Sequence, residues 1–222
     1  MKKVIVIAPH PDDETLGCGG TILKHRLQGD DVHWLIVTNI SDEKGWPAAK
    51  VRARQEEIKK VGRMYGFKEI HKLDFPTTEL DQIPMNDLVA VMSKVVSVVK
   101  PQIVYLPNRS DVHTDHQVIF KAAMGCTKNF RYPFIERILM YEVPSETEFA
   151  PALSESVFIP NVFMDITPFI EKKLKIMSIY QSEVMKPPLP RSLATIKALA
   201  QWRGSHISKP YAEAFTLLKE IN

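Results

Sequence analysis

The chain has 222 residues, of which 45% are hydrophobic and 25% charged, as expected for an ordinary globular domain with a sizeable core. Its 29 basic and 26 acidic residues give a formal net charge of +3 and are interspersed along the chain. So small and scattered an excess argues against a nucleic-acid-binding surface. It leaves room for a substrate that carries a carboxylate or a phosphate.

Two cysteines, Cys18 and Cys126, are too few for a disulfide framework, and we expect both to be buried free thiols. The apolar run at residues 4–8 stops at Pro9, which makes it too short for a signal peptide. No stretch approaches the ~20 apolar residues of a membrane span. We therefore expect an unprocessed, cytoplasmic protein without a membrane span.

The first predicted element is a strand at residues 4–8, a β-branched run typical of a strand buried on both faces. A helix over residues 17–28 follows and stops at Gly29. The next strand covers residues 32–37. A long amphipathic helix then extends over residues 47–65.

The same alternation continues with a short strand at residues 70–73 and a helix over residues 86–100, whose apolar positions recur at helical spacing. A fourth strand is predicted at residues 103–106. A helix over residues 116–128 separates it from a fifth strand at residues 138–141.

The pattern loosens after about residue 145. We predict a strand at residues 162–166, helices over residues 168–180 and 191–202, and an exposed proline-rich loop at residues 185–190. The chain shows no internal repeat and no domain boundary, so residues 1–222 are expected to form one domain.

Alternating strands and helices with short loops indicate a parallel sheet with helices on both faces. We predict a Rossmann-like three-layer α/β domain with a mostly parallel sheet in the order 3-2-1-4-5, plus C-terminal additions. In this order the first and fourth strands are neighbours, and ligands bind beyond their carboxyl ends. The two most polar loops of the first half follow these strands, at residues 9–14 and 108–116.

These two loops supply three histidines and several carboxylates, ligands that suit zinc and related divalent metals. A catalytic zinc keeps three protein ligands and one position for water. Hydrolysis also needs a base that is not a ligand. Asp12 and Asp13 could divide these tasks, because neighbouring side chains in an extended turn point in different directions. Taken alone, however, the first loop could simply be a turn that caps the following helix.

The segment A-P-H-P-D-D-E at residues 8–14 resembles the A-H-P-D-D-E signature of the LmbE-like proteins. This family includes PIG-L and the deacetylases of the mycothiol and bacillithiol pathways. H-T-D-H at residues 113–116 resembles the family's second motif, H-x-D-H. Further similarity lies at residues 54–57, 180–182 and 211–215, which match its R-x-E-E, Y-x-S and Y-A-E-x-F segments.

The resemblance implies a zinc-dependent deacetylase of an N-acetylglucosamine-type sugar or conjugate. It implies that His10, Asp13 and His116 are the zinc ligands, although Fe²⁺ or another divalent ion suits the same ligand types. It also implies that Asp12 is the general base. Protonated His113 would stabilise the oxyanion or protonate the leaving amine, and Asp115 would orient His113.

Three residues are expected to contact the substrate: Arg54, Arg109 and Asp111. Asp111 stands where some branches of the family have a tyrosine. The family's Y-x-S-Q segment ends here in Glu183, and its usual H-P-D-H contains threonine here. These departures spare the metal ligands and leave the particular sugar undetermined. Members of the family are commonly homo-oligomers, so a homo-oligomer is expected.

Three other functions stay open on the sequence. The first is an amidase that cleaves a larger acyl group or a thiol conjugate, and the second is a metal-binding module without turnover. The third is a nucleotide-binding regulator, suggested by the glycines at residues 17–20. The dinucleotide fingerprint is broken, however, because Ile22 replaces a glycine and Asn39 an acid. His25, His33 and His71 have no partner in the sequence pattern and are expected to be structural.

Overall fold

The structure is a computed structural model that describes residues 1–222. Seven strands form one sheet. They are β1 (Lys3–Ala8), β2 (Asp31–Asn39), β3 (Glu69–Pro76), β4 (Ile103–Pro107), β5 (Arg137–Tyr141), β6 (Val162–Asp165) and β7 (Ala212–Glu220). Their order across the sheet is β3-β2-β1-β4-β5-β7-β6. The first five are parallel, and β7 is antiparallel to both β5 and β6. The predicted order 3-2-1-4-5 is confirmed.

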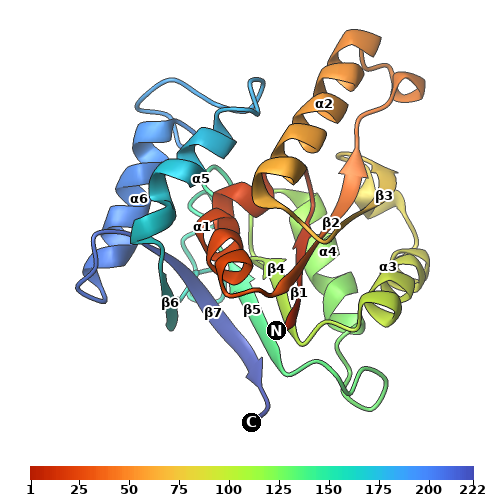
Figure 1. Cartoon of the computed structure of the whole chain (residues 1–222). Helices are drawn as coiled ribbons and strands as arrows, with labels where there is room; N and C mark the ends of the chain where they lie inside the picture. The colour runs from red at the N-terminus through yellow and green to blue at the C-terminus, as the bar shows by residue number, and fades with distance from the viewer.

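Six α-helices and three short 3₁₀ turns connect the strands (Figure 1). The helices are α1 (Asp13–Leu27), α2 (Ala48–Tyr65), α3 (Met85–Val99), α4 (Thr114–Gly125), α5 (Ile170–Met177) and α6 (Leu193–Ser205). The turns are η1 (Asp42–Lys44), η2 (Leu80–Gln82) and η3 (Thr167–Phe169). None of the helices combines the length and apolar character that a bilayer crossing requires.

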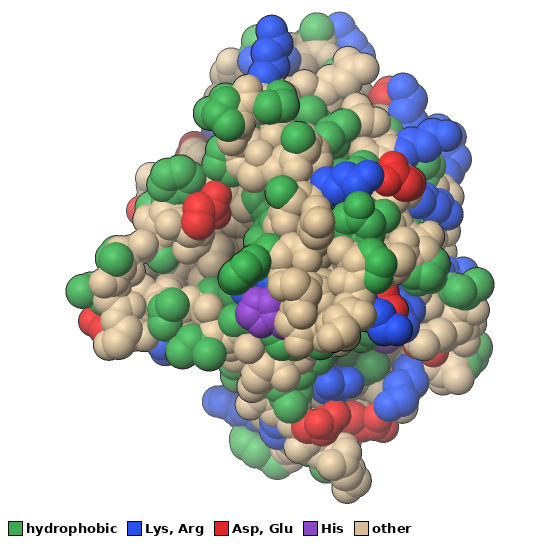
Figure 2. Space-filling view, turned by 90° about the vertical axis from the view of Figure 1, so that its left-hand side faces the viewer, with side chains coloured by type: hydrophobic (Ala, Val, Ile, Leu, Met, Phe, Trp, Pro, Cys, Tyr) green, Lys and Arg blue, Asp and Glu red, His purple; other side chains and the backbone are tan.

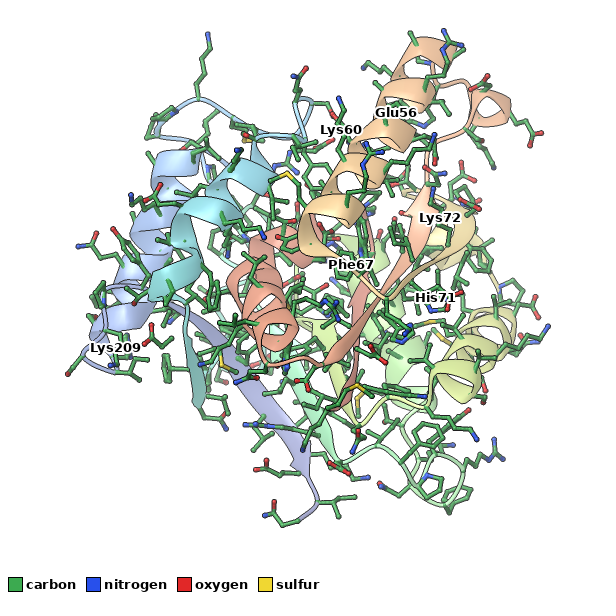
Figure 3. The ribbon with its side chains drawn as sticks, in the orientation of Figure 1. Glu56, Lys60, Phe67, His71, Lys72 and Lys209 are labelled. Atoms are coloured by element: carbon green, nitrogen blue, oxygen red, sulfur yellow. The ribbon has the colours of Figure 1, made fainter.

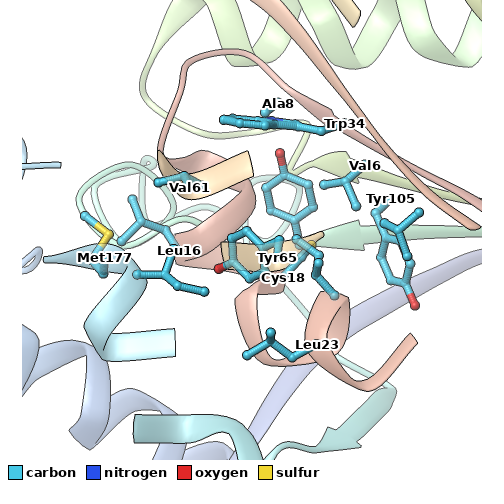
Figure 4. Packing of buried hydrophobic residues seen from close by; sticks show 14 of the residues in the cluster. Val6, Ala8, Leu16, Cys18, Leu23, Trp34, Val61, Tyr65, Tyr105 and Met177 are labelled. Carbon is cyan, nitrogen blue, oxygen red and sulfur yellow. The ribbon is translucent and has the colours of Figure 1, made fainter. Parts of the chain in front are cut away.

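Two hydrophobic cores lie on opposite faces of the sheet, because side chains alternate along each strand. Val4 and Val6 of β1 pack beneath α1, α2, α5 and α6, in the larger core that Figure 4 shows. Ile5 and Ile7 pack beneath α3 and α4. This is the predicted three-layer arrangement. Cys18 lies in the first core and Cys126 in the second, both as buried free thiols.

The structure corrects four helix starts by two residues or more and adds one strand. Helix α1 begins at Asp13, four residues before the predicted start, and α4 begins at Thr114 rather than at residue 116. Helices α5 and α6 begin at Ile170 and Leu193, each two residues later than predicted. Strand β7 was not predicted. Its first half is buried and its second half is partly exposed, and it contains the charged residue Glu213 within the buried half, so its sequence shows no clear strand pattern.

Glu213 is buried because it forms an ion pair with Lys173 of α5 (Oε1 to Nζ, 2.6 Å). The pair contacts the middle of α1. The Gly20 N–H donates to Glu213 (2.8 Å), and the Leu16 carbonyl accepts from Lys173 Nζ (2.8 Å). Every charge in this group is therefore paired and hydrogen-bonded. The last strand of the chain thereby fixes the first helix.

The glycines within α1 allow this helix to pack closely against its neighbours. A Cβ on Gly17 would clash with the Tyr141 ring, and one on Gly20 would clash with Ile166. The glycines thus allow α1 to approach the sheet and the C-terminal segment, which accounts for them without a dinucleotide site.

Candidate active site

Two loops meet at the carboxyl end of the sheet because β1 and β4 are parallel neighbours. The loop after β1 leads into α1 and carries His10, Asp12 and Asp13. The loop after β4 leads into α4 and carries His113 and His116. All five side chains line one pocket of about 510 Å³, a volume typical of small-molecule sites.

His10, Asp13 and His116 direct one ligand atom each toward a common point. Asp13 Oδ2 lies 3.4 Å from His10 Nδ1 and 3.4 Å from His116 Nε2, and the two nitrogens are 3.3 Å apart. Ligands about 2.0–2.1 Å from a tetrahedral zinc ion are separated by about 3.3–3.4 Å. The three side chains proposed as ligands therefore have the spacing that one metal ion requires.

In both imidazoles, the ring nitrogen that faces away from the common point is hydrogen-bonded to a carboxylate. His10 Nε2 donates to Asp115 Oδ2 (3.0 Å), and His116 Nδ1 donates to Asp111 Oδ2 (2.8 Å). These bonds leave His10 Nδ1 and His116 Nε2 as the nitrogens that face the common point. A carboxylate behind a ligating histidine is the usual arrangement at protein metal sites, so these residues fit a divalent cation.

The carboxylates also shift the pKa values of the metal-free cluster. Burial would lower the pKa of His10, but Asp115 and Asp13 outweigh it and raise that pKa to about 9. The pKa of His116 is likewise raised against burial, by Asp13 and Asp111. Burial would raise the pKa of Asp13, but the two histidines hold it well below its usual range. Without a metal, the cluster therefore binds protons where the cation would sit.

The Asp12 carboxylate does not share the histidine partners of the Asp13 carboxylate. Asp12 is 4% exposed, and its carboxylate accepts no hydrogen bond within the protein. Its nearest charged partner is Arg191, whose Nη1 lies 3.9 Å from Oδ2. Burial, together with Asp13 and Glu183, raises the pKa of Asp12 well above its usual range. A buried carboxylate without a fixed partner is available to accept a proton.

The backbone of Asp12 is strained, with φ of 139°, a conformation that costs a side-chain-bearing residue about 1–3 kcal/mol. Two contacts hold it there. The Asp12 N–H donates to Glu14 Oε2 (3.0 Å), and Tyr180 donates to the other oxygen of Glu14 (2.8 Å). The Tyr-x-Ser segment thus supports Asp12 through Glu14.

His113 is the N-cap of α4, and its Nδ1 accepts a hydrogen bond from the Asp115 N–H (3.1 Å). We expected the Asp115 carboxylate to orient this ring. That expectation is corrected, because the carboxylate binds His10, Thr78 N–H and Leu80 N–H instead. Burial and the neighbouring His10 and His116 lower the pKa of His113 to about 4. Neutral His113 then carries its proton on Nε2.

Only one of the three expected substrate contacts lines the pocket, and it is Arg54. Its guanidinium donates to the Pro11 carbonyl (2.7 Å) and pairs with Glu183. Arg109 lies outside the pocket and donates to the Glu155 carbonyl (2.6 Å). Asp111 is fully buried behind His116, and its other oxygen accepts from Asn108 and Thr147, so no oxygen is left for a substrate.

The sequence reasoning missed several pocket residues: Trp46, Glu146, Glu183 and Arg191. Similarity at residues 180–182 pointed to the segment that precedes Glu183. Nothing in the sequence marked Arg191, a single arginine after Pro190, because its position depends on how the loop before α6 folds back over the site.

A three-layer α/β domain with a His-Asp-His cluster able to hold a metal ion and a carboxylate beside it is typical of metal-dependent hydrolases. Residues 5–127, more than half of the chain, match the PIG-L family, which is described as GlcNAc-PI de-N-acetylase. The chain belongs to this family, and it is accordingly a deacetylase that hydrolyses an N-acetyl amide bond.

Two curated relatives agree with this assignment. A diacetylchitobiose deacetylase of Thermococcus kodakarensis is 28% identical, over 100% of this chain and 85% of the relative. A probable N-acetyl-alpha-D-glucosaminyl L-malate deacetylase 2 of Bacillus anthracis is 24% identical over 82% of this chain and 81% of the relative. Among solved structures, the conserved protein TT1542 from Thermus thermophilus has a TM-score of 0.79 at 24% identity. That match covers 100% of this chain and 97% of TT1542, and it supports the fold.

Proposed function

We propose that the protein removes the acetyl group from an N-acetylglucosamine-type sugar or conjugate, with zinc held by His10, Asp13 and His116. The observation that carries this proposal is the nearly equal spacing of three ligand atoms beside the Asp12 carboxylate, which accepts no hydrogen bond within the protein. The names of the two curated relatives add support, since both describe deacetylases of N-acetylglucosamine-containing sugars.

A zinc ion held by these three residues would activate a water and polarise the acetyl carbonyl. The part of Asp12 is to accept one proton of the attacking water as the water oxygen bonds to the acetyl carbon. The carbon–nitrogen bond then breaks with its electron pair on nitrogen. Asp12 returns the proton to that nitrogen, and acetate and the free amine leave. A raised pKa suits both the acceptance and the return of the proton.

His113 acts on the other reacting atom. Because Asp115 N–H occupies Nδ1, the neutral ring presents Nε2–H to the pocket. This group donates a hydrogen bond to the acetyl oxygen as negative charge develops there. In this proposal neutral His113 replaces the protonated His113 of the sequence-based expectation, because its pKa is lowered to about 4.

The far side of the pocket suits a sugar. Trp46, 38% exposed, offers an aromatic face against which a pyranose ring can pack. Arg54, Glu183 and Arg191 offer charged donors and acceptors to hydroxyl groups. Which sugar or conjugate is bound depends on this wall, where the chain departs from the family pattern at Glu183.

A second candidate is an amidase for a larger acyl group. A mainly apolar pocket of about 780 Å³ adjoins the first one, and Val143 lines both. Phe158 and Leu199 belong to its wall. An acyl chain longer than acetyl could extend from the metal site into this space.

The deciding experiment measures acid release by the zinc-loaded protein from a panel of N-acetylated sugars and conjugates. For each sugar, further compounds carry a propionyl, butyryl or octanoyl group on the nitrogen in place of acetyl. Asp12→Asn is the variant expected to be inactive. We expect acetate release that falls with acyl length and disappears in the variant. Faster turnover of long acyl groups would favour the second candidate. No release from any compound by zinc-loaded protein would contradict both.

Two further expectations belong to this proposal. A homo-oligomer fits the exposed apolar side chains of the C-terminal region, among them Trp202 at 62% exposure. Figure 2 shows the side of the molecule on which α5 and α6 lie, with hydrophobic side chains exposed at several places. Light scattering with size-exclusion chromatography gives the mass, and a monomer at all concentrations would contradict this expectation. A cytoplasmic location is the other expectation.

A further inference from the structure

Two histidines expected to be structural lie together on the outer strands of the sheet, far from the pocket loops in sequence. His33 of β2 and His71 of β3 stack with ring centroids 5.4 Å apart, and His33 Nδ1 lies 3.2 Å from His71 Nε2. Glu69 completes the group, with Oε2 3.6 Å from His71 Nε2. The three ligand atoms lie within 4.8 Å of one another.

The strand register creates this group. His33 is paired with Glu69 across the β2–β3 ladder, and His71 follows Glu69 by two residues. Side chains two residues apart on a strand share a face. His33 and His71 therefore emerge on the same side of the sheet as Leu35 and Val37, which pack in the α3–α4 core. Figure 3 labels His71 on β3, the strand at the edge of the sheet.

We propose that His33, Glu69 and His71 form a second binding site for a divalent cation of the zinc type, separate from the catalytic centre. The nitrogen–nitrogen distance of 3.2 Å is close to the separation of about 3.3 Å between two ligands of tetrahedral zinc. Two imidazoles and a carboxylate favour zinc-type ions over magnesium or calcium, which prefer oxygen ligands.

The surroundings suit an ion that enters from solvent. His33 is 7% exposed, whereas the Glu69 side chain is 59% exposed and leaves one side of the group open. Burial and the neighbouring His71 lower the pKa of His33, and burial lowers the pKa of His71. Both rings are therefore neutral at neutral pH, the form that binds metal. Charge nearby is balanced, with Asp31 and Lys3 as the other groups close to His33.

The site would join the edge strand to the sheet. β3 ends at Pro76, and the following residues Thr77 and Thr78 line the catalytic pocket. The β2–β3 register shifts after Ile36, between the histidines and that pocket segment. A cation bound by both strands would fix the half of β3 that precedes the shift. The ion thus has a structural role at the strand that delivers the pocket residues.

The test compares zinc stoichiometry in the full-length chain. Metal-free wild type and variants are dialysed against zinc and the bound ions are counted by elemental mass spectrometry. We expect wild type to bind one ion more than His71→Gln and one more than His33→Gln. His206→Gln, a histidine outside both clusters, should equal wild type. Equal zinc in wild type and His71→Gln would overturn the proposal, whatever the catalytic site binds.

A milder variant guards against misfolding. Glu69→Gln changes only an exposed side chain and should weaken the second zinc about tenfold or more, while acetate release stays unchanged. Cobalt supplies an independent signal, because a tetrahedral Co²⁺ absorption band should lose one component in His71→Gln. An identical cobalt spectrum and identical zinc affinity in Glu69→Gln would also overturn the site.

Discussion

The first five strands and the C-terminal segment build the active site in different ways. The region through β5 supplies every proposed metal ligand, the proposed base Asp12 and His113. Residues 142–222 supply Glu183 and Arg191 to the pocket wall, and Tyr180 and Glu213 to the supports beneath α1. In the proposed function, the reaction chemistry thus resides in the parallel region. The antiparallel region lines the pocket with Glu183 and Arg191 and contacts α1 through Glu213.

The contrast between the two regions can be tested by substitution, and the largest expected effect on activity comes from Asp12→Asn. This change removes the proton acceptor while preserving side-chain volume, so kcat should fall about 10³-fold with zinc content unchanged. Glu183→Gln, in the other region, should alter KM far more than kcat. Steady-state kinetics and metal analysis measure both. Near-normal kcat in Asp12→Asn would remove Asp12 from the reaction.

The next effect tests the support from the C-terminal region. Lys173→Met leaves Glu213 as an uncompensated buried charge, which should cost about 3–5 kcal/mol of unfolding free energy and lower Tm by about 10 °C. Urea unfolding measures the loss. The double variant Lys173→Met/Glu213→Leu should recover much of it. If the single variant were as stable as wild type, the ion pair would not support α1.

The metal cluster should show a strong pH dependence of its own. His10 has a pKa of about 9 in the metal-free protein, so below that pH zinc must displace its proton. Zinc affinity should therefore rise at least tenfold per pH unit from pH 7 to about pH 9, and more steeply wherever His116, whose pKa is also raised, gives up a second proton. Competition titrations with a chelator of known pH behaviour measure this slope. A flat profile would contradict the protonated resting cluster.

Asp111 was expected to contact the substrate and instead lies behind His116. Asp111→Asn should weaken zinc binding about 10- to 100-fold and leave KM at saturating zinc nearly unchanged. Isothermal titration with zinc, followed by kinetics on the loaded variant, separates the two effects. A raised KM with normal zinc affinity would restore the substrate role.

The smallest effect comes from Arg191, which connects the two regions. Its positive charge lowers the pKa of Asp12, so Arg191→Gln should raise that pKa and protonate the base at higher pH. The acid limb of the kcat/KM profile should move upward by a fraction of a pH unit. Arg109→Gln, outside the pocket, is the control and should leave the limb in place.

The sequence predicted the parallel region well because its signals are local. Buried strands such as residues 4–8 read as unbroken β-branched runs, and the two polar loops fall at neighbouring strand ends. The resemblance added the separate proposed roles of Asp12 and Asp13, and the two carboxylates have different partners in the structure.

The C-terminal region was harder to predict because its residues gain meaning only from distant partners. Glu213 lay within a recognised segment, but its partner Lys173 is 40 residues earlier and carried no signal. Arg191 reaches Asp12 across most of the chain length. The partners of Asp115 and Asp111 were also not apparent from the sequence. In the structure Asp115 contacts His10 rather than orienting His113, and Asp111 contacts His116 rather than lining the pocket.

The bond between β7 and α1 also constrains the order of events during protein synthesis. The motif at residues 10–13 leaves the ribosome early. In the helix that follows it, Leu16 lacks its partner until Lys173 has emerged, and Gly20 lacks its partner until Glu213 has emerged. A nascent chain that stops before β7 would therefore carry all the proposed metal ligands but not the Glu213 contact to α1, the helix that begins at Asp13. Activity should appear only once β7 has been synthesised, so that chains truncated before this strand should be inactive.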